Sequence, residues 1–177
     1  MDKRELMTFF ALLTILFPFS SAIQISEVMV DCGNLSFNCE YVELFSADKI
    51  DLRGYVLDTT GQKFSLNGTL QGYLVITKSK IAFLERYENK QLLEWKSMGL
   101  TNTGDTVRIF NNQQMIDEYS YSKSSKNLSW QKIEDWKECQ PTPSEENVCP
   151  NNQESKVTSE EKNKPEKIVP LQTLPLT

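Results

Sequence analysis

The chain has 177 residues, of which 24 are acidic, 19 are basic and none is histidine. A net negative charge without a cluster of Lys or Arg argues against a nucleic-acid partner, because an acidic surface repels a phosphate backbone. Once a leader and a polar tail are set aside, the remaining length suits one domain of ordinary size.

Residues 1–22 have the order of a secretory signal peptide. A short charged start precedes an apolar run at 6–19, and Ser20 and Ala22 place small side chains where signal peptidase needs them. Cleavage is therefore predicted after Ala22. The alternative is an uncleaved membrane anchor, although the run is shorter than the roughly 20 residues of a spanning helix. Either way, the rest of the chain is predicted to be secreted or displayed at the cell surface.

Short runs of alternating apolar and polar residues fill the segment from 23 to 133. This period is typical of half-buried antiparallel strands. The runs predict strands at residues 23–30, 40–46, 54–58, 63–66, 73–77, 106–110, 115–121 and 129–133. Turns are expected at 59–61 and at Asn111 and Asn112, which tolerate left-handed backbone. Strands of this number and spacing indicate a sandwich or a barrel.

One helical connection is predicted, over residues 79–88. Ile81, Leu84 and Tyr87 recur at three-residue spacing, and Ser79 can cap the start. We expect a turn or two of helix that links the two sheets. Core packing is the preferred interpretation of Phe83 and Tyr87.

Four cysteines follow the leader, an even number that indicates disulfides in an exported chain. Three pairings are possible. Cys32 with Cys39 and Cys139 with Cys149 is the favoured pairing, because each bond closes a short loop at one end of the domain. Zinc is the alternative, but the chain has no Cys-x-x-Cys pair and no histidine to hold it.

The composition changes at Pro150. Residues 150–177 are rich in Asn, Gln, Glu, Lys, Ser and Pro and contain no aromatic residue. Apolar side chains are too sparse there to offset the entropy of ordering, so a disordered tail or linker is predicted. The domain proper is thus expected at 23–149.

Several short motifs occur in a fixed order within 23–149. They are ISEVM at 25–29, EYVEL at 40–44, IDLRGYVL at 50–57, GYLVI at 72–76, LTNTGDTVRI at 100–109, DEYSY at 117–121, SW at 129–130 and PTPSEEN at 141–147. Together they resemble the lamin-tail domain, as found in nuclear lamins and in exported prokaryotic proteins. The resemblance implies an all-β, immunoglobulin-like Greek-key sandwich of about eight short antiparallel strands. Its signature positions are Glu43, Gly54, Tyr55, Gly104, Asp105 and Trp130. Gln113, Gln114 and Ser144 stand where that family usually has glycine.

Physical roles can be assigned to several of these positions. Gly54 and Gly104 precede strands and are expected to supply a positive φ or a close backbone approach. Asp105 can cap its own turn by accepting hydrogen bonds from backbone amides. Inward packing is expected of four aromatic residues, Tyr55, Tyr73, Trp130 and Trp136, with an aromatic ligand shelf as the alternative.

Acidic residues crowd the first third of the domain, at Glu27, Glu40, Glu43, Asp48, Asp51 and Asp58. A pair of them could perform acid–base hydrolysis or bind calcium. Glu40 and Glu43 have opposite strand parity, however, so they should not share a face. A solvated sheet surface is the preferred interpretation. The sequence has no histidine, no nucleophile-elbow motif, no phosphate-binding glycine loop and no paired-cysteine metal knuckle. We therefore expect no enzyme, no cofactor and no metal site.

Three sequons, at Asn34, Asn67 and Asn127, lie in predicted turns or strand starts and are candidate glycosylation sites. The resemblance implies a non-catalytic interaction or tethering module that binds a protein or envelope partner through loops and sheet edges. The alternative is a carbohydrate- or calcium-dependent adhesive domain that uses the acidic loops and an aromatic residue such as Trp136.

Overall fold

The computed structural model describes residues 23–33, 38–88 and 91–150. The predicted leader with Ala22, the sequon at Asn34 and the tail from 151 lie outside these residues. The strands are β1 (Gln24–Met29), β2 (Tyr41–Asp51), β3 (Tyr55–Thr59), β4 (Gln62–Ser65), β5 (Thr69–Thr77), β6 (Leu92–Glu94), β7 (Asp105–Asn111), β8 (Gln114–Tyr121), β9 (Ser129–Lys132) and β10 (Trp136–Cys139). The helix is α2 (Lys80–Leu84).

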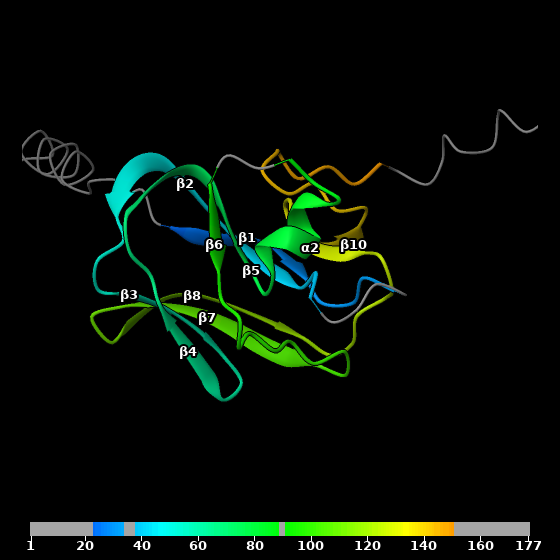
Figure 1. Ribbon diagram of the computed structural model, residues 1–177, viewed down its shortest axis with the longest axis horizontal. Coiled ribbons are helices and arrows are strands. Elements are labelled where there is room, and N and C mark those ends of the chain that lie inside the picture. Colours follow the sequence, from blue (N-terminus) through cyan, green and yellow to red (C-terminus); the bar gives the residue numbers. More distant parts are fainter. Residues whose placement is uncertain (1–22, 34–37, 89–90, 151–177) are drawn as a thin grey trace, which may run out of the picture.

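The strands form two sheets, which pack as the layers of a sandwich (Figure 1). Sheet A has six strands in the order β10-β9-β1-β2-β5-β6, and sheet B has four in the order β4-β3-β7-β8. The expected all-β sandwich is confirmed. The eight predicted strands are all present, but β6 and β10 were not predicted. The pairing of β5 with β6 is parallel, whereas only antiparallel pairs were expected.

The main core lies between the two sheets. It gathers inward-pointing aliphatic residues from both layers, among them Ile25, Val28, Val42, Leu44, Leu57, Leu70, Ile76, Val107 and Ile109. Three of the four singled-out aromatic residues pack against this core as expected, namely Tyr55, Trp130 and Trp136. The expectation for Tyr73 is wrong. It pairs with Phe45 across β5 and β2, next to the inward-pointing Leu74, and therefore faces outward, where its ring lies 4.8 Å from that of Phe45.

The helix differs from the prediction in two respects. It connects β5 to β6, both in sheet A, so it does not link the two sheets. Ser79 is the N-cap as expected, and its side chain accepts a hydrogen bond from the Ala82 amide. Phe83 is fully buried, but Ile81 and Leu84 are 75% and 54% exposed. The three-residue spacing of apolar residues therefore did not mark the buried face.

The turns contain residues with positive φ as expected, but one turn lies one residue later in the chain than predicted. Gly54 and Gly104 have φ of 86° and 129°, and a Cβ on Gly104 would lie 3.0 Å from the Tyr121 carbonyl oxygen. The β7–β8 turn is centred on Asn112 and Gln113, with φ of 46° and 73°. The predicted Asn111–Asn112 turn is thus one residue out, because Asn111 still belongs to β7.

Two disulfides join Cys32 to Cys39 and Cys139 to Cys149, which is the favoured pairing. Such bonds form and persist in oxidising compartments, so they indicate an extracytoplasmic environment. In the part of the chain that the structure describes, no helix is long and apolar enough to cross a membrane.

Candidate functional site

The two outer faces of the sandwich differ in what covers them. The outer face of sheet A carries α2 and a segment at residues 141–147, which we call the strap (Figure 1). The strap follows β10 and is closed by the Cys139–Cys149 disulfide. The outer face of sheet B carries no other element of the described residues. Each face holds a group of polar side chains, and we describe the covered group first.

A bulge in β1 determines which side chains enter the covered site. Ile25 pairs with Leu44, but Glu27 pairs with Glu43, so Ser26 is the extra residue. The bulge keeps Ile25 in the core and turns Glu27 outward, opposite Glu43. The Ile25 amide donates a hydrogen bond to Asp117 Oδ2 on β8, at 2.9 Å. Asp117 therefore links the bulge to the edge of sheet B.

Glu27 and Glu43 form a buried carboxyl pair beneath the strap. Both residues are 0% exposed, and among the described residues no Lys or Arg forms an ion pair with either. Hydroxyl groups donate hydrogen bonds to both carboxyls: Tyr41 donates to Glu27 Oε1 at 2.5 Å, and Ser26 donates to Glu43 Oε1 at 2.8 Å. Neutral donors thus replace the cations that usually accompany buried acids.

The strap supplies further donors through its backbone. The Thr142 amide donates to Glu27 Oε1 at 3.2 Å, and the Ser144 amide donates to Glu43 Oε2 at 2.5 Å. Ser144 has a φ of 72°, a left-handed conformation within the strap. Asn147 closes the contact by donating from Nδ2 to the carbonyl oxygens of Ser26 and Lys132, at 2.7 Å and 3.1 Å.

Burial favours the protonated form of both carboxyls. Burial raises the pKa of Glu43 to about 8, against the effect of the Ser144 amide, and the nearby Glu27 raises it further. Burial also raises the pKa of Glu27. Because the two carboxyls interact, the proton belongs to the pair as a unit.

The preference for a solvated acidic surface is wrong for three of the six acids. Glu27, Glu40 and Glu43 are buried, whereas Asp48 and Asp51 are exposed. Glu40 accepts a hydrogen bond from the Leu100 amide at 3.1 Å and lies 3.6 Å from Lys78 Nζ. Glu40 and Glu43 thus have separate partners, in line with their opposite parity.

Sequence reasoning singled out both glutamates but did not bring them together. The strand alternation alone gives Glu27 the same parity as Ile25, and only the bulge at Ser26 reverses it. A polar side chain at 27 within the apolar run ISEVM was the available signal.

The covered pair has the residues for proton transfer but no access for a substrate. Both carboxyls lie under the strap and are completely buried. The described residues contain no group of three or more acidic or cysteine side chains that could hold a metal ion. As arranged, the pair holds the strap against sheet A.

An apolar row crosses the uncovered face of sheet B. Val56 pairs with Phe110, and Phe110 pairs with Met115, so the three side chains lie next to one another on adjacent strands. None belongs to or packs against either hydrophobic cluster. Met115 is 49% exposed, and the other two are half-buried. This row was not predicted from the sequence. Because Phe110 follows the core residue Ile109 in a strand, its side chain points to the opposite, outer face, and this alternation could have indicated the row.

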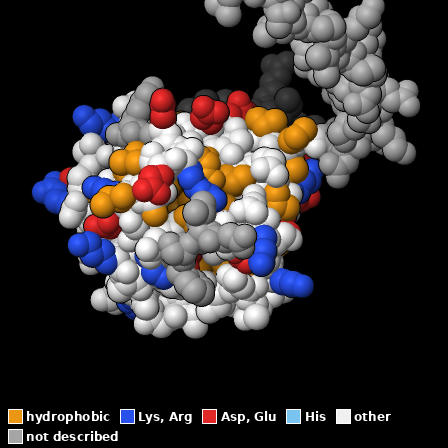
Figure 2. All heavy atoms as spheres, turned by 45° about the vertical axis from the view of Figure 1, so that its right-hand side comes forward, with side chains coloured by type: hydrophobic (Ala, Val, Ile, Leu, Met, Phe, Trp, Pro, Cys, Tyr) orange, Lys and Arg blue, Asp and Glu red, His pale blue; other side chains and the backbone are white. Residues whose placement is uncertain are grey.

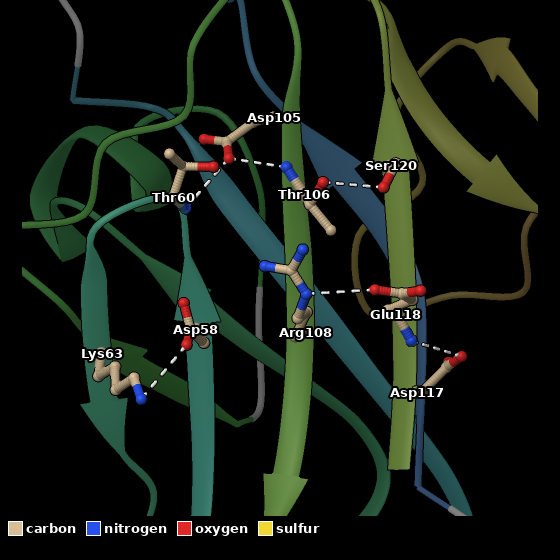
Figure 3. A network of polar contacts seen from close by, with 9 residues as sticks. All are labelled: Asp58, Thr60, Lys63, Asp105, Thr106, Arg108, Asp117, Glu118 and Ser120. Atoms are coloured by element: carbon tan, nitrogen blue, oxygen red, sulfur yellow. Dashed lines mark hydrogen bonds and ion pairs between the residues drawn. The ribbon is translucent and has the colours of Figure 1, made fainter. Parts of the chain in front are cut away.

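A charged row runs beside the apolar row. Asp58 pairs with Arg108, and Arg108 pairs with Glu118. Figure 3 shows Arg108 Nε directed at Glu118 Oε2, at 3.2 Å, and Lys63 Nζ near Asp58 Oδ2, at 3.7 Å. Each acid on this face therefore has a basic partner, and the face as a whole is close to neutral.

Asp105 stands at the end of this face and joins two hairpins. Its Oδ1 accepts hydrogen bonds from the amides of Thr106, at 2.7 Å, and Thr60, at 3.1 Å (Figure 3). Neither amide belongs to the turn at residues 101–104, so these contacts differ from the expected capping of its own turn. Thr60 lies in the β3–β4 turn. Asp105 therefore fixes the β3–β4 hairpin relative to β7.

The remaining predicted site residues are dispersed. Asn67 and Asn127 are exposed on separate turns, and Asn127 lies against Gly33 with a φ of 61°. Trp136 stacks on Tyr119 with ring centroids 3.6 Å apart, so one face of its ring is occupied. This contact leaves less of Trp136 for a carbohydrate shelf. Figure 2 shows hydrophobic side chains exposed on the upper half of the domain. On α2, Ile81 and Leu84 are exposed.

No family model matches the chain, and no curated protein matches its sequence.

Proposed function

We propose that the protein is a non-catalytic, extracytoplasmic interaction module that binds a protein or envelope partner through the outer face of sheet B and its adjoining edges and loops. The observation that carries this proposal is the apolar row of Val56, Phe110 and Met115 beside a charged row, on a face that no described element covers. Aromatic residues, Met and Arg are the residue types enriched where proteins meet.

The lamin-tail resemblance supports the same class of function. Members of that family are attached to varied exported or envelope proteins, and the resemblance implies a role in contacts. Two of the motifs that carry it, EYVEL and PTPSEEN, meet in this fold through the hydrogen bond from the Ser144 amide to Glu43. Fold analogy alone does not identify a partner.

The distribution of acids supports a role without catalysis. The chain has no histidine, and the directly paired carboxyls of Glu27 and Glu43 lie buried beneath the strap. The acids on the outer face of sheet B, Asp58 and Glu118, are paired with Lys63 and Arg108. Such pairs contribute more to orientation and selectivity than to affinity.

The proposal is tested by two matched substitutions of exposed apolar residues. Met115→Asp places a charge in the apolar row of sheet B, and Ile81→Asp places the same charge on α2 at the opposite side of the sandwich. Binding of the labelled, disulfide-bonded protein to the cell envelope fraction of its source is measured for each. We expect Met115→Asp to weaken binding at least about tenfold, as loss of an interface anchor does, and Ile81→Asp to leave it unchanged.

Near-ultraviolet circular dichroism of both variants serves as the control for folding. Loss of binding with Ile81→Asp alone, or equal binding by both folded variants, would exclude the outer face of sheet B as the interaction surface.

A further inference from the structure

We propose that the strap is a pH-dependent cover, held closed by a proton that Glu27 and Glu43 share and loosened when that proton is lost. This inference concerns sheet A and is independent of any partner at sheet B. It begins with the fact that the two carboxyls pair directly across β1 and β2, with no exposure to solvent.

Each carboxyl has its own donors, and each set includes one strap amide. Glu27 accepts from Tyr41 and the Thr142 amide, and Glu43 accepts from Ser26 and the Ser144 amide. With one proton on the pair, a single negative charge faces these donors. Without it, two negative charges lie opposite each other in a dry site, which is costly unless water enters.

No described Lys or Arg side chain forms an ion pair with Glu27 or Glu43 that could compensate for a second charge. The titratable and charged side chains on the surrounding elements are Tyr41 on β2, Tyr73 on β5, Arg86 and Tyr87 after α2, Lys132 on β9, Lys137 on β10, and Glu145 and Glu146 in the strap. Lys132 is directed at Asp117, with Nζ 3.5 Å from Oδ2. The pKa values of Tyr41 and Tyr73 are raised, mainly by burial, so both phenols stay neutral.

The strap is the part of the surroundings that can move at least cost. β1, β2 and β9 are joined by strand ladders, and displacing any of them would break several backbone hydrogen bonds. The strap is held to sheet A by the two amide contacts and by the side chain of Asn147. The Cys139–Cys149 disulfide limits how far it can lift. Loss of the proton is therefore expected to open the strap locally, without unfolding the sandwich.

The pKa directions agree with this geometry. Burial raises the pKa of Glu43 to about 8, and the neighbouring Glu27 contributes in the same direction. The cover is therefore expected to be closed at acidic and neutral pH and to loosen as the pH rises through about 8.

The test is an NMR titration of the disulfide-bonded protein from about pH 5 to about pH 9.5. We expect the Ser144 amide proton and one glutamate carboxyl carbon of the pair to shift together with a midpoint near 8. Above it, hydrogen exchange of the Thr142 and Ser144 amides, corrected for intrinsic rates, should increase relative to that of Leu44 in β2. Ionisation of both carboxyls near the ordinary glutamate pKa would overturn the proposal.

Matched variants separate the pair from other titrating groups. Glu43→Gln retains the shape of the side chain but removes the charge, so the strap should stay protected over the whole range. Glu27→Gln serves the same purpose should Glu43→Gln not fold. Glu118→Gln, the same change on sheet B, should leave the strap transition as in the wild type. Identical exchange of the strap amides in wild type and Glu43→Gln would contradict the proposal.

A cation is the competing occupant of a site with two carboxyls, so calcium is added at about pH 8.5 in a second series. We expect no change in strap protection. Protection restored by calcium in the wild type would assign the ionised pair to a metal ion and overturn the proposal.

Discussion

The two outer faces of this sandwich place similar residue types in opposite situations. On sheet A, Glu27 and Glu43 lie under the strap with no basic partner. On sheet B, Asp58 and Glu118 lie beside Lys63 and Arg108. The difference shows that the strand register, with its bulge at Ser26, places an acid on a face, whereas the element that covers the face decides whether the acid is buried without a basic partner.

The apolar residues follow the same division. On sheet A, Phe83 of α2 packs edge-on against Tyr41, within a second hydrophobic cluster that also contains the Cys32–Cys39 disulfide. On sheet B, Phe110 lies in a row that nothing in the described residues covers. A phenylalanine on one face therefore stabilises the fold, and on the other it is available to a partner.

The largest expected effect separates these two phenylalanines. Phe83→Ala removes a fully buried ring and should lower the free energy of unfolding by about 3–5 kcal/mol. Phe110→Ala removes a half-buried ring from an open surface and should cost about 1 kcal/mol or less. Urea denaturation of both variants measures the difference. Equal losses would mean that the outer face of sheet B is structurally covered after all.

A smaller effect of opposite sign is expected at the β7–β8 turn, on the uncovered side. Gln113 has a φ of 73° and follows Asn112, also left-handed, at the centre of a two-residue hairpin turn. Glycine adopts this conformation without steric cost, so Gln113→Gly should raise the free energy of unfolding by about 0.5–1 kcal/mol. The same urea assay is used, with Gln62→Gly, in the edge strand β4, as a control that should be destabilising.

The sequence predicted the sandwich because most strands alternate clearly, as in the run from Asp105 to Asn111. It missed β6, whose three residues are too short to show a period, and β10, where Trp136 lies among charged residues. It also missed the carboxyl pair, because the pairing depends on the bulge at Ser26. The strap contacts join residues about a hundred positions apart, which no local pattern encodes.

The comparison of the two faces rests on the state of their acids, and pH-dependent stability tests it most directly. The pKa of Glu43 is raised from 4.5 to about 8 in the fold, so its contribution to stability is full below about pH 4.5 and is lost as the pH rises through about 8. The free energy of unfolding of the wild type, Glu43→Gln and Glu118→Gln is measured by urea denaturation from about pH 5 to about pH 9.

We predict that stability falls across this range in the wild type and in Glu118→Gln, and that Glu43→Gln removes most of the fall. The same pH dependence of the free energy of unfolding in the wild type and in Glu43→Gln would contradict the assignment of the buried, protonated acids to sheet A. A free energy of unfolding that is independent of pH in Glu118→Gln alone would contradict it as well.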